Sequence, residues 1–298
     1  MNQKEKNKPN FAFWGTDEFS LTVLERLKKN NYLPSIVVTV PDQPQGRKMI
    51  LTPPLVKIWA KENNIDFIQP TNLRELDKDT KAQLNKSYDF FLIASYGKII
   101  PADILNIPHH GSLNIHPSLL PKYRGPSPLE TAILNGDEET GVTIMLVDAE
   151  MDHGPILAQE KIELKDRYNF ANLRDKLATL GTDLLLKILP DYLDNKLKPE
   201  EQDHTQATIT KKFTKDDGYL DPQTPVISRY RKFLALNPWP GTYFDYPGPQ
   251  GKIRLIIKEA HLEKSENNEE KIVYDKVIPA GRKEMSWDAF LKGLKSKE

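Results

Sequence analysis

The residues Ser112–Leu157, SLNIHPSLLPKYRGPSPLETAILNGDEETGVTIMLVDAEMDHGPIL, decide the fold and the chemistry that the sequence predicts. Residues two apart on a strand point to the same side, so Asn114 and His116 are expected to project together from one strand end. The apolar run Gly141–Val147 predicts a neighbouring strand, and the loop after it can bring Asp152 to the imidazole. An amide, an imidazole and a carboxylate can polarise a carbonyl and move a proton, provided that the substrate supplies its own nucleophile.

Strands alternate with helices from the N-terminus to Pro190. Apolar runs predict strands at Phe11–Trp14, Ile36–Val40, Asp66–Gln69, Phe90–Ser95, Leu113–His116, Gly141–Val147 and Ile156–Ile162. Helical spacing of apolar residues predicts helices at Phe19–Leu27, Leu55–Asn63, Pro128–Leu134 and Phe170–Leu189. This alternation indicates an α/β fold, an open, twisted, mostly parallel, Rossmann-like sheet with helices on both faces. Ligands bind beyond the carboxyl ends of strands in such sheets, where Gly15-Thr16, Tyr96-Gly97 and Asp148–Asp152 are also expected.

The composition changes after Pro190. Residues Asp191–Gln206 are polar and charged, which is typical of a linker, and shorter β-like segments with turns follow from Ala207. A helix is expected at Ser228–Leu236, and strands are expected at Thr242–Tyr246, Lys252–Ala260 and Ile272–Val277. These segments predict a small OB-like β-barrel. The expected organisation is a disordered tail at 1–9, a catalytic domain at 10–190, a linker at 191–207 and a C-terminal domain at 208–298.

The composition narrows the class of protein. The 298 residues include 42 basic and 42 acidic side chains, so any polyanionic partner must be held by a local patch rather than by the global charge. The chain has no Cys, which excludes disulfides, thiolate metal sites and a Cys nucleophile. The N-terminal MNQKEKNKPN lacks the apolar core of a secretion signal, and no apolar run is long enough to span a bilayer. We expect a cytoplasmic protein without membrane contact, and a monomer as the default.

Two other kinds of site receive little support from the residues. A metal site at His116 and Asp152 lacks a third ligand at a suitable spacing, so no metal is expected. Gly15-Thr16 follows a strand, as the turn of a dinucleotide-binding unit does, but the pattern is not G-x-G-x-x-G.

The chain resembles the methionyl-tRNA formyltransferase family of formyltetrahydrofolate-dependent enzymes. Besides Ser112–Leu157, the similar segments are FAFWGTDEFS from Phe11, PDQPQGRKMILTPPLVKIWAKENNIDFIQP from Pro41, ASYGKIIPADIL from Ala94, LNPWPGTYF from Leu236 and PAGRKEMSWDAF from Pro279. The resemblance implies transfer of the formyl group of 10-formyltetrahydrofolate, as co-substrate, to the α-amine of methionine on initiator tRNA.

The resemblance also implies roles for particular residues. Asn114, His116 and Asp152 match the family's catalytic residues, the first two stabilising a tetrahedral intermediate and the third assisting proton transfer. The folate site is implied at the SLLP segment, Ser118, Leu119, Leu120 and Pro121, and at Tyr96 and Gly97. Contacts with tRNA are implied at Arg47, Lys48 and Arg124, and more generally for the C-terminal domain.

The C-terminal domain departs from the family pattern. Fewer strands fit between Ala260 and Pro279 than the family has, and the chain stops soon after Phe290. This leaves open whether the barrel is complete or trimmed.

Two alternatives to methionyl-tRNA formylation stay open at this point. One keeps the chemistry but transfers the formyl group to a small amine, either glycinamide ribonucleotide or an amino sugar nucleotide. The other is a noncatalytic protein that binds tRNA or folate. The intact set of Asn114, His116 and Asp152 argues against the second, because a pure binding protein has no need of it.

Overall fold

The computed structural model describes residues 8–46, 48–164, 168–249, 251–264 and 267–295. The expected disordered tail falls mostly outside these ranges, and so does Arg47. The strands are β1 (Phe11–Gly15), β2 (Ile36–Val38), β3 (Gln43–Gln45), β4 (Ile50–Thr52), β5 (Asp66–Ile68), β6 (Phe90–Ala94), β7 (Ser112–His116), β8 (Glu139–Leu146), β9 (Ile156–Glu163), β10 (Thr242–Gly248), β11 (Gly251–Lys264), β12 (Glu270–Pro279) and β13 (Met285–Ser286). The helices are α1 (Glu18–Lys29), α2 (Leu55–Glu62), α3 (Lys78–Leu84), α4 (Ala102–Leu105), α5 (Pro128–Asn135), α6 (Phe170–Leu193), α7 (Val226–Ala235) and α8 (Trp287–Lys295), with short 3₁₀ turns at His204–Gln206 and Lys215–Gly218.

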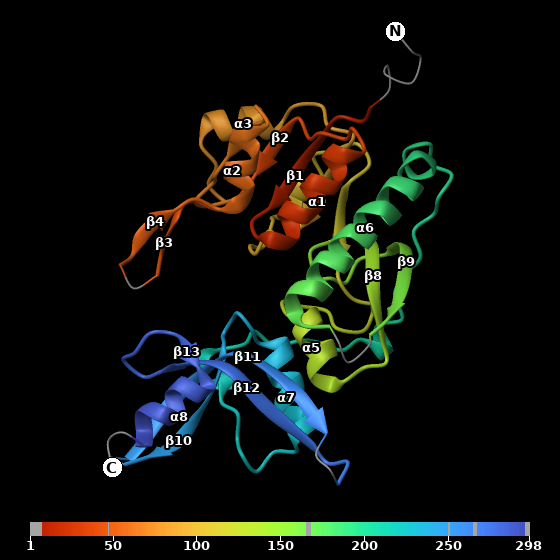
Figure 1. Ribbon diagram of the computed structural model, residues 1–298. Helices are drawn as coiled ribbons and strands as arrows, with labels where there is room; N and C mark the ends of the chain where they lie inside the picture. The colour runs from red at the N-terminus through yellow and green to blue at the C-terminus, as the bar shows by residue number, and fades with distance from the viewer. Residues whose placement is uncertain (1–7, 47, 165–167, 250, 265–266, 296–298) are drawn as a thin grey trace. The chain divides into compact units, whose positions relative to one another are not determined.

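The N-terminal part is built on a seven-stranded sheet of order β5-β2-β1-β6-β7-β8-β9 (Figure 1). The strands from β5 to β7 pair in parallel, whereas β8 runs antiparallel to β7. Every residue of β1 and β6 is buried, as expected for central strands covered on both faces. The predicted open, mostly parallel α/β sheet is therefore confirmed.

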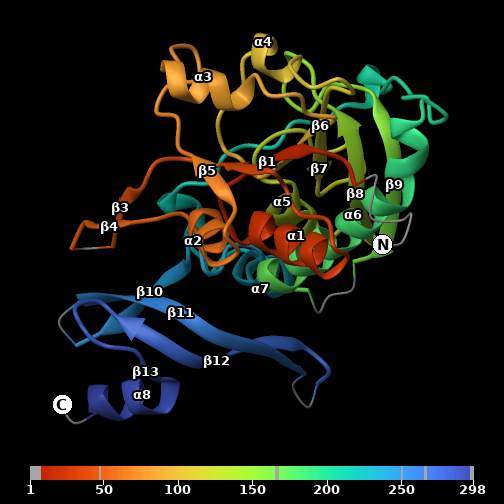
Figure 2. The same ribbon diagram turned by 90° about the horizontal axis from the view of Figure 1, so that it is seen from above.

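Helices cover both faces of this sheet, with α3 and α4 on one side and α1 and α2 on the other (Figure 2). On the first side Trp14, Val38 and Ile93 pack in one buried cluster with Leu84 of α3 and Leu105 of α4. On the second side α1 buries Phe19, Val23, Leu24 and Leu27, the residues whose spacing predicted the helix. The 3.6-residue periodicity of this segment thus matches the face that α1 buries.

Polar side chains join the carboxyl ends of β1 and β6. The Ser20 hydroxyl donates to the Ala94 carbonyl at 2.6 Å, and the Thr16 hydroxyl donates to the Tyr96 carbonyl at 2.9 Å. Asp17 caps α1 by accepting from the Ser20 amide, and burial raises the pKa of its carboxyl. These bonds fix the turn Gly15-Thr16 that the sequence places at the functional edge of the sheet.

The C-terminal part holds an antiparallel sheet of order β10-β11-β12-β13. Leu255, Ile257 and Val277 from this sheet pack with Phe233 of α7 and Phe290 of α8. Within the part of the chain that the structure describes, β10 and β13 are not paired, so the sheet stays open. The small C-terminal β domain is confirmed, but its described strands form an open antiparallel sheet rather than the closed barrel that was predicted.

The chain forms two compact units whose limits differ from the expected domain boundaries. The first comprises Met1–Pro126, Thr140–Ile162 and Arg174–Thr210, and the second comprises Ser127–Glu139, Glu163–Leu173 and Lys211–Glu298. The expected linker at 191–207 thus packs with the first unit, while α5 packs against α7 in the second. Periodicity shows that a segment is helical or polar, but not which neighbour it packs on.

The sequence did not predict the hairpin β3–β4, which projects from the first unit (Figure 1). Gln43–Gln45 has neither β-branched residues nor apolar alternation, so no strand was expected there. The turn contains Gly46 and Met49 with φ of 69° and 50°. Met49, Ile50 and Leu51 are 68%, 61% and 64% exposed, so this hairpin presents apolar surface next to Lys48.

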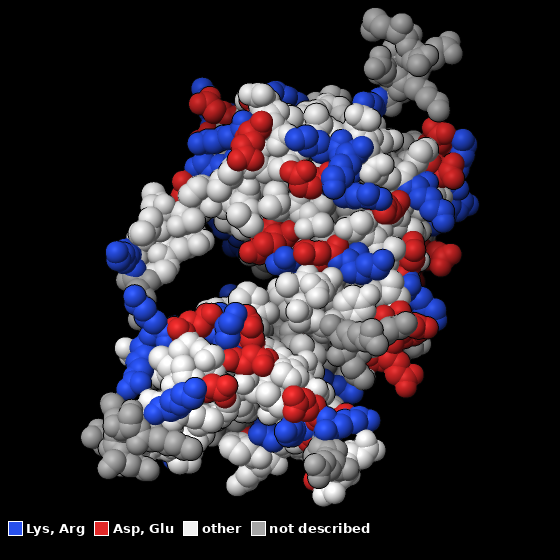
Figure 3. Space-filling view, in the orientation of Figure 1, with Lys and Arg blue, Asp and Glu red and all other residues white. Residues whose placement is uncertain are grey.

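The charge distribution agrees with the balanced composition. Figure 3 shows basic and acidic side chains interspersed on the face that it presents. None of the helices in the described ranges has the length and apolar character that crossing a membrane requires.

Candidate active site

Strand β7 places Asn114 and His116 on one face of the sheet, as the two-residue spacing predicts. Leu113 and Ile115 point to the other face and are fully buried. His116 is 4% exposed, so its imidazole lies in a nearly water-free environment. Pairing of β7 with β6 on one side and β8 on the other fixes the direction of both side chains.

The two side chains converge on Asp152. Asn114 Nδ2 lies 3.4 Å from Asp152 Oδ1, and His116 Nδ1 lies 3.5 Å from the same oxygen. The other carboxylate oxygen, Oδ2, accepts a hydrogen bond of 2.8 Å from the Gly125 amide. The structure therefore brings the three predicted residues together, with two donors aimed at one point.

The imidazole of His116 faces oxygen on both sides. Nε2 lies 3.0 Å from the Tyr123 carbonyl, while Nδ1 faces the Asp152 carboxylate. A carbonyl oxygen only accepts, so Nε2 carries a proton, and a proton on Nδ1 would also find an acceptor. Both ring nitrogens therefore have an oxygen partner in the structure.

The loop that carries Asp152 takes a different path from the expected one. Because β8 is antiparallel to β7, Leu146 pairs with Leu113 at the amino end of β7, and the chain must turn back to reach Asn114. Asp152 itself has φ of 51°, in the left-handed region that non-glycine residues rarely occupy. Strand direction is set by tertiary pairing, so the sequence could not show this return.

The SLLP segment predicted for folate is held rigidly beside the site. Thr143 on β8 donates through its hydroxyl to the Ser118 carbonyl at 2.6 Å and accepts from the Leu120 amide at 3.2 Å. The Ser118 hydroxyl donates to the Lys122 carbonyl, which closes the turn, and Leu120 is buried. The side chains of Leu119 and Pro121 are the more exposed ones, so these two can contact a ligand directly.

Tyr96 and Gly97, also predicted for folate, follow β6. The Tyr96 ring is 2% exposed and packs edge-on against Trp14 at 5.2 Å. Burial raises the pKa of its hydroxyl to about 12, and no described residue bonds this group. Its ring is therefore part of the core, and the backbone at Tyr96-Gly97 is the portion free to border a ligand.

The residues predicted for tRNA contacts fall in different environments. Arg47 lies outside the described residues, and Lys48 is exposed beside the turn of the β3–β4 hairpin. Arg124 is only 8% exposed. Its guanidinium bonds Gln202 Oε1 at 2.7 and 3.1 Å and His204 Nδ1 at 2.8 Å. A side chain this enclosed has little surface for a phosphate, and the expectation of a tRNA contact at Arg124 does not fit its position.

Sequence reasoning missed Gln202 and the residues around it. Gln202 is 5% exposed, and its Nε2 donates to the Asp152 carbonyl at 3.0 Å and to the Gly154 carbonyl at 2.7 Å. It lies within the polar stretch that predicted a linker, and nothing in that stretch distinguishes a buried Gln from a solvated one.

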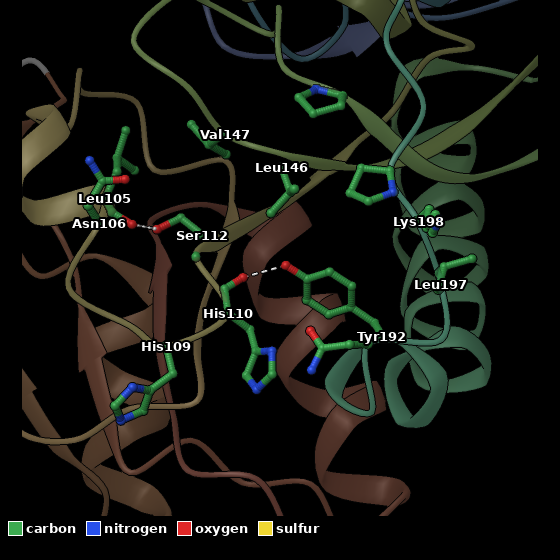
Figure 4. Close-up of a pocket in the computed structure, with 14 residues that line it drawn as sticks. Leu105, Asn106, His109, His110, Ser112, Leu146, Val147, Tyr192, Leu197 and Lys198 are labelled. Atoms are coloured by element: carbon green, nitrogen blue, oxygen red, sulfur yellow. Dashed lines mark hydrogen bonds between the residues drawn. The ribbon is translucent and has the colours of Figure 1, made fainter.

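The first unit also contains a cavity of about 560 Å³ at the amino end of β7. Figure 4 shows its lining, in which Ser112 Oγ donates to the Leu105 carbonyl and Tyr192 donates to the His110 carbonyl. Its lining contains neither the catalytic cluster nor the residues predicted for folate. The convergence of Asn114, His116 and Asp152, rather than this hollow, marks the candidate active site.

Within the described residues, no group of three or more His, Cys, Asp or Glu side chains is arranged to hold a metal ion.

Comparison with known proteins places the chain in a family. Residues 10–189 match the formyl transferase family. The chain belongs to that family. It is 39% identical to a methionyl-tRNA formyltransferase of Chloroflexus aurantiacus, over 95% of this chain and 96% of the relative. It is 36% identical to a methionyl-tRNA formyltransferase of Bacillus mycoides, over 95% of each chain.

Solved structures share the fold of this formyl transferase. The methionyl-tRNA formyltransferase from Clostridium thermocellum superposes with a TM-score of 0.60 at 20% identity, over 91% of this chain and 98% of that one. HypX from Aquifex aeolicus superposes with a TM-score of 0.69 at 14% identity, over 97% of this chain and 50% of that one. At such identities the likeness concerns the fold alone.

Proposed function

We propose that this formyl transferase moves the formyl group of 10-formyltetrahydrofolate to the α-amine of methionine on initiator tRNA. The relatives that it matches over nearly its whole length are methionyl-tRNA formyltransferases. The observation that carries the proposed mechanism is that Asn114 Nδ2 and His116 Nδ1 lie 3.4 and 3.5 Å from the same oxygen, Asp152 Oδ1.

In the proposed reaction the methionine α-amine attacks the formyl carbon. A carbon–nitrogen bond forms to the amine, the bond to folate N10 breaks, and one proton passes from the amine to N10. Asn114 and His116 donate to the oxygen of the tetrahedral intermediate, which lies beside Asp152 Oδ1, the oxygen that both of their N–H groups now approach. One such donor contributes roughly 3 kcal/mol to transition-state stabilisation.

Asp152 accepts the amine proton in this proposal. The Gly125 amide holds one of its oxygens, so the other faces His116 and the reacting centre. The carboxylate also orients the imidazole ring toward the oxyanion.

We place the folate and tRNA sites where the predicted residues have exposed side chains or backbone. Folate is held between the SLLP segment, through Leu119 and Pro121, and the backbone at Tyr96-Gly97. The acceptor end of tRNA meets the β3–β4 hairpin, where Lys48 supplies positive charge beside exposed apolar side chains. Phosphate contacts of this kind position a nucleic acid without reading its sequence.

The test is a formyl-transfer assay with 10-formyltetrahydrofolate and a panel of amines. The panel contains charged initiator Met-tRNA, charged elongator Met-tRNA, glycinamide ribonucleotide and an amino sugar nucleotide. We expect the highest kcat/KM with initiator Met-tRNA. A higher kcat/KM with either small amine would contradict the tRNA assignment, and tRNA binding without product would point to a noncatalytic protein.

A further inference from the structure

The segment Glu200–Thr210, here called the strap, bonds to both loops that form the catalytic cluster. It begins after the residues that match the formyl transferase family, which end at residue 189. At its start Glu200 exchanges two backbone hydrogen bonds with Ile156, at 2.7 and 2.8 Å. At its end Thr208 and Thr210 each form a backbone hydrogen bond of 2.8 Å with Arg124.

Gln202, in the middle of the strap, is saturated with hydrogen bonds. Its Nε2 donates to the carbonyls of Asp152 and Gly154, and its Oε1 accepts two bonds from the Arg124 guanidinium. Reversal of the amide would place its NH2 against the guanidinium and its oxygen against two carbonyls. One orientation is therefore fixed, because each contact pairs a donor with an acceptor only in that orientation.

These contacts hold Asp152 at both of its ends. Gln202 holds the backbone carbonyl of Asp152, whose φ of 51° needs support from its surroundings. The Gly125 amide holds the carboxylate, and the preceding residue, Arg124, is paired to the strap through its backbone. The strap thus fixes both the residue that carries the carboxylate and the group that orients it.

We propose that Gln202 is a positioning residue, which acts on catalysis by fixing Asp152, and that Arg124 in turn fixes Gln202. This inference rests on the catalytic role proposed for Asp152. It gives Arg124 a role inside the protein, which agrees with its burial.

The test compares Gln202→Leu with Gln206→Leu in single-turnover formylation of Met-tRNA. Gln206 lies on the same strap, but it is exposed and bonds Asp203. We expect Gln202→Leu to lower the single-turnover rate about 30- to 100-fold, with KM for both substrates within about twofold, because a misplaced catalytic group loses rate rather than binding. Gln206→Leu is expected to stay near the parent rate.

A double-mutant cycle separates positioning from a general loss of structure. In an Asp152→Asn background, Gln202→Leu should cost less than about threefold further, because the group that it positions is already disabled. Gln202→Glu serves as a second variant: it keeps the acceptor for Arg124 but sets carboxylate oxygen against two carbonyls, and it should also lose rate.

The outcomes are distinct. A Gln202→Leu rate within about twofold of the parent, or an equal loss in the Asp152→Asn background, overturns the positioning role. If circular dichroism shows that Gln202→Leu is unfolded, Gln202→Glu takes its place. A Gln202→Glu rate within about twofold of the parent, or an equal loss in the Asp152→Asn background, then overturns the positioning role. An active Asp152→Asn enzyme would instead contradict the proposed catalytic role of Asp152 itself.

Discussion

The catalytic cluster and the β3–β4 hairpin belong to the same compact unit, yet they are organised in opposite ways. His116 is 4% exposed, and polar contacts from three segments fix the cluster around it. Met49, Ile50 and Leu51 on the hairpin are each more than half exposed. Contacts within the protein hold the cluster in place, whereas the hairpin presents its side chains to solvent.

This difference suits the cluster to chemistry and the hairpin to recognition of a partner. Preorganised donors in a dry site stabilise a developing charge without reorganisation, so small displacements there are costly. An exposed charge contributes affinity that depends on salt, and its loss changes binding more than turnover. Changes in the two regions should therefore affect different kinetic parameters.

The largest effect is expected at the imidazole. His116→Ala should lower kcat by about 10³-fold, because it removes an oxyanion donor and a group that handles protons. KM for Met-tRNA should change little, as measured by steady-state formylation. Equal losses in kcat and in tRNA affinity would contradict the assignment of turnover to the cluster and of tRNA binding to the hairpin. His109→Ala, on an exposed histidine outside the cluster, is the matched control.

A smaller effect is expected where the backbone holds Asp152. Gly125 has φ of +106°, and a Cβ there would lie 2.9 Å from Thr210 Oγ1. Gly125→Ala should displace the amide that bonds Asp152, and it should lower kcat about 10²-fold. Gly281→Ala, at φ of +73° with open space around it, is the control for backbone strain alone. Similar kinetics for the two variants would show that the Gly125 amide does not position Asp152 for catalysis.

On the hairpin, Lys48→Ala should raise KM for Met-tRNA about three- to tenfold and leave kcat unchanged. Loss of one phosphate contact should also reduce the slope of log affinity against log salt by about one. Lys29→Ala, which removes an exposed charge on α1, is the matched control. An unchanged salt slope in Lys48→Ala would show that this hairpin position does not contact the nucleic acid.

The smallest effect concerns stability in the second unit. Bonding to Lys211 and to Thr214 lowers the pKa of Asp217 to about 2, below the value of about 3.9 in unfolded chains. A carboxyl with a lowered pKa stabilises the fold above pH 4, and this contribution is lost as the pH falls toward 2. Asp217→Asn should thus lower the free energy of unfolding by about 0.5–1 kcal/mol at pH 7 and by nearly nothing at pH 2. Urea unfolding at both pH values measures this, and an equal difference at both would contradict the assignment.

Much of the fold and the catalytic cluster could be predicted from the sequence. Uninterrupted apolar runs such as Phe90–Ala94 identify buried strands, and the Asn114–His116 spacing places both side chains on one face. The hairpin β3–β4 was not predicted because residues such as Gln43 and Pro44 carry no strand signal.

The environment of the site could not be predicted in the same way. Gln202 and Arg124 are polar residues in polar stretches, and only tertiary packing buries them against the Asp152 loop. The antiparallel direction of β8 is likewise a property of pairing, not of local pattern. The sequence around a residue does not show which distant segments that residue contacts in the fold.

We propose that Asn114, His116 and Asp152 act together on the formyl group of the folate co-substrate. The most direct measurement is the single-turnover rate of Met-tRNA formylation by Asp152→Asn, with tRNA and folate both saturating and binding of each confirmed separately. We expect a fall of at least about 10²-fold with both ligands still bound. A rate within a few-fold of the parent enzyme would contradict it.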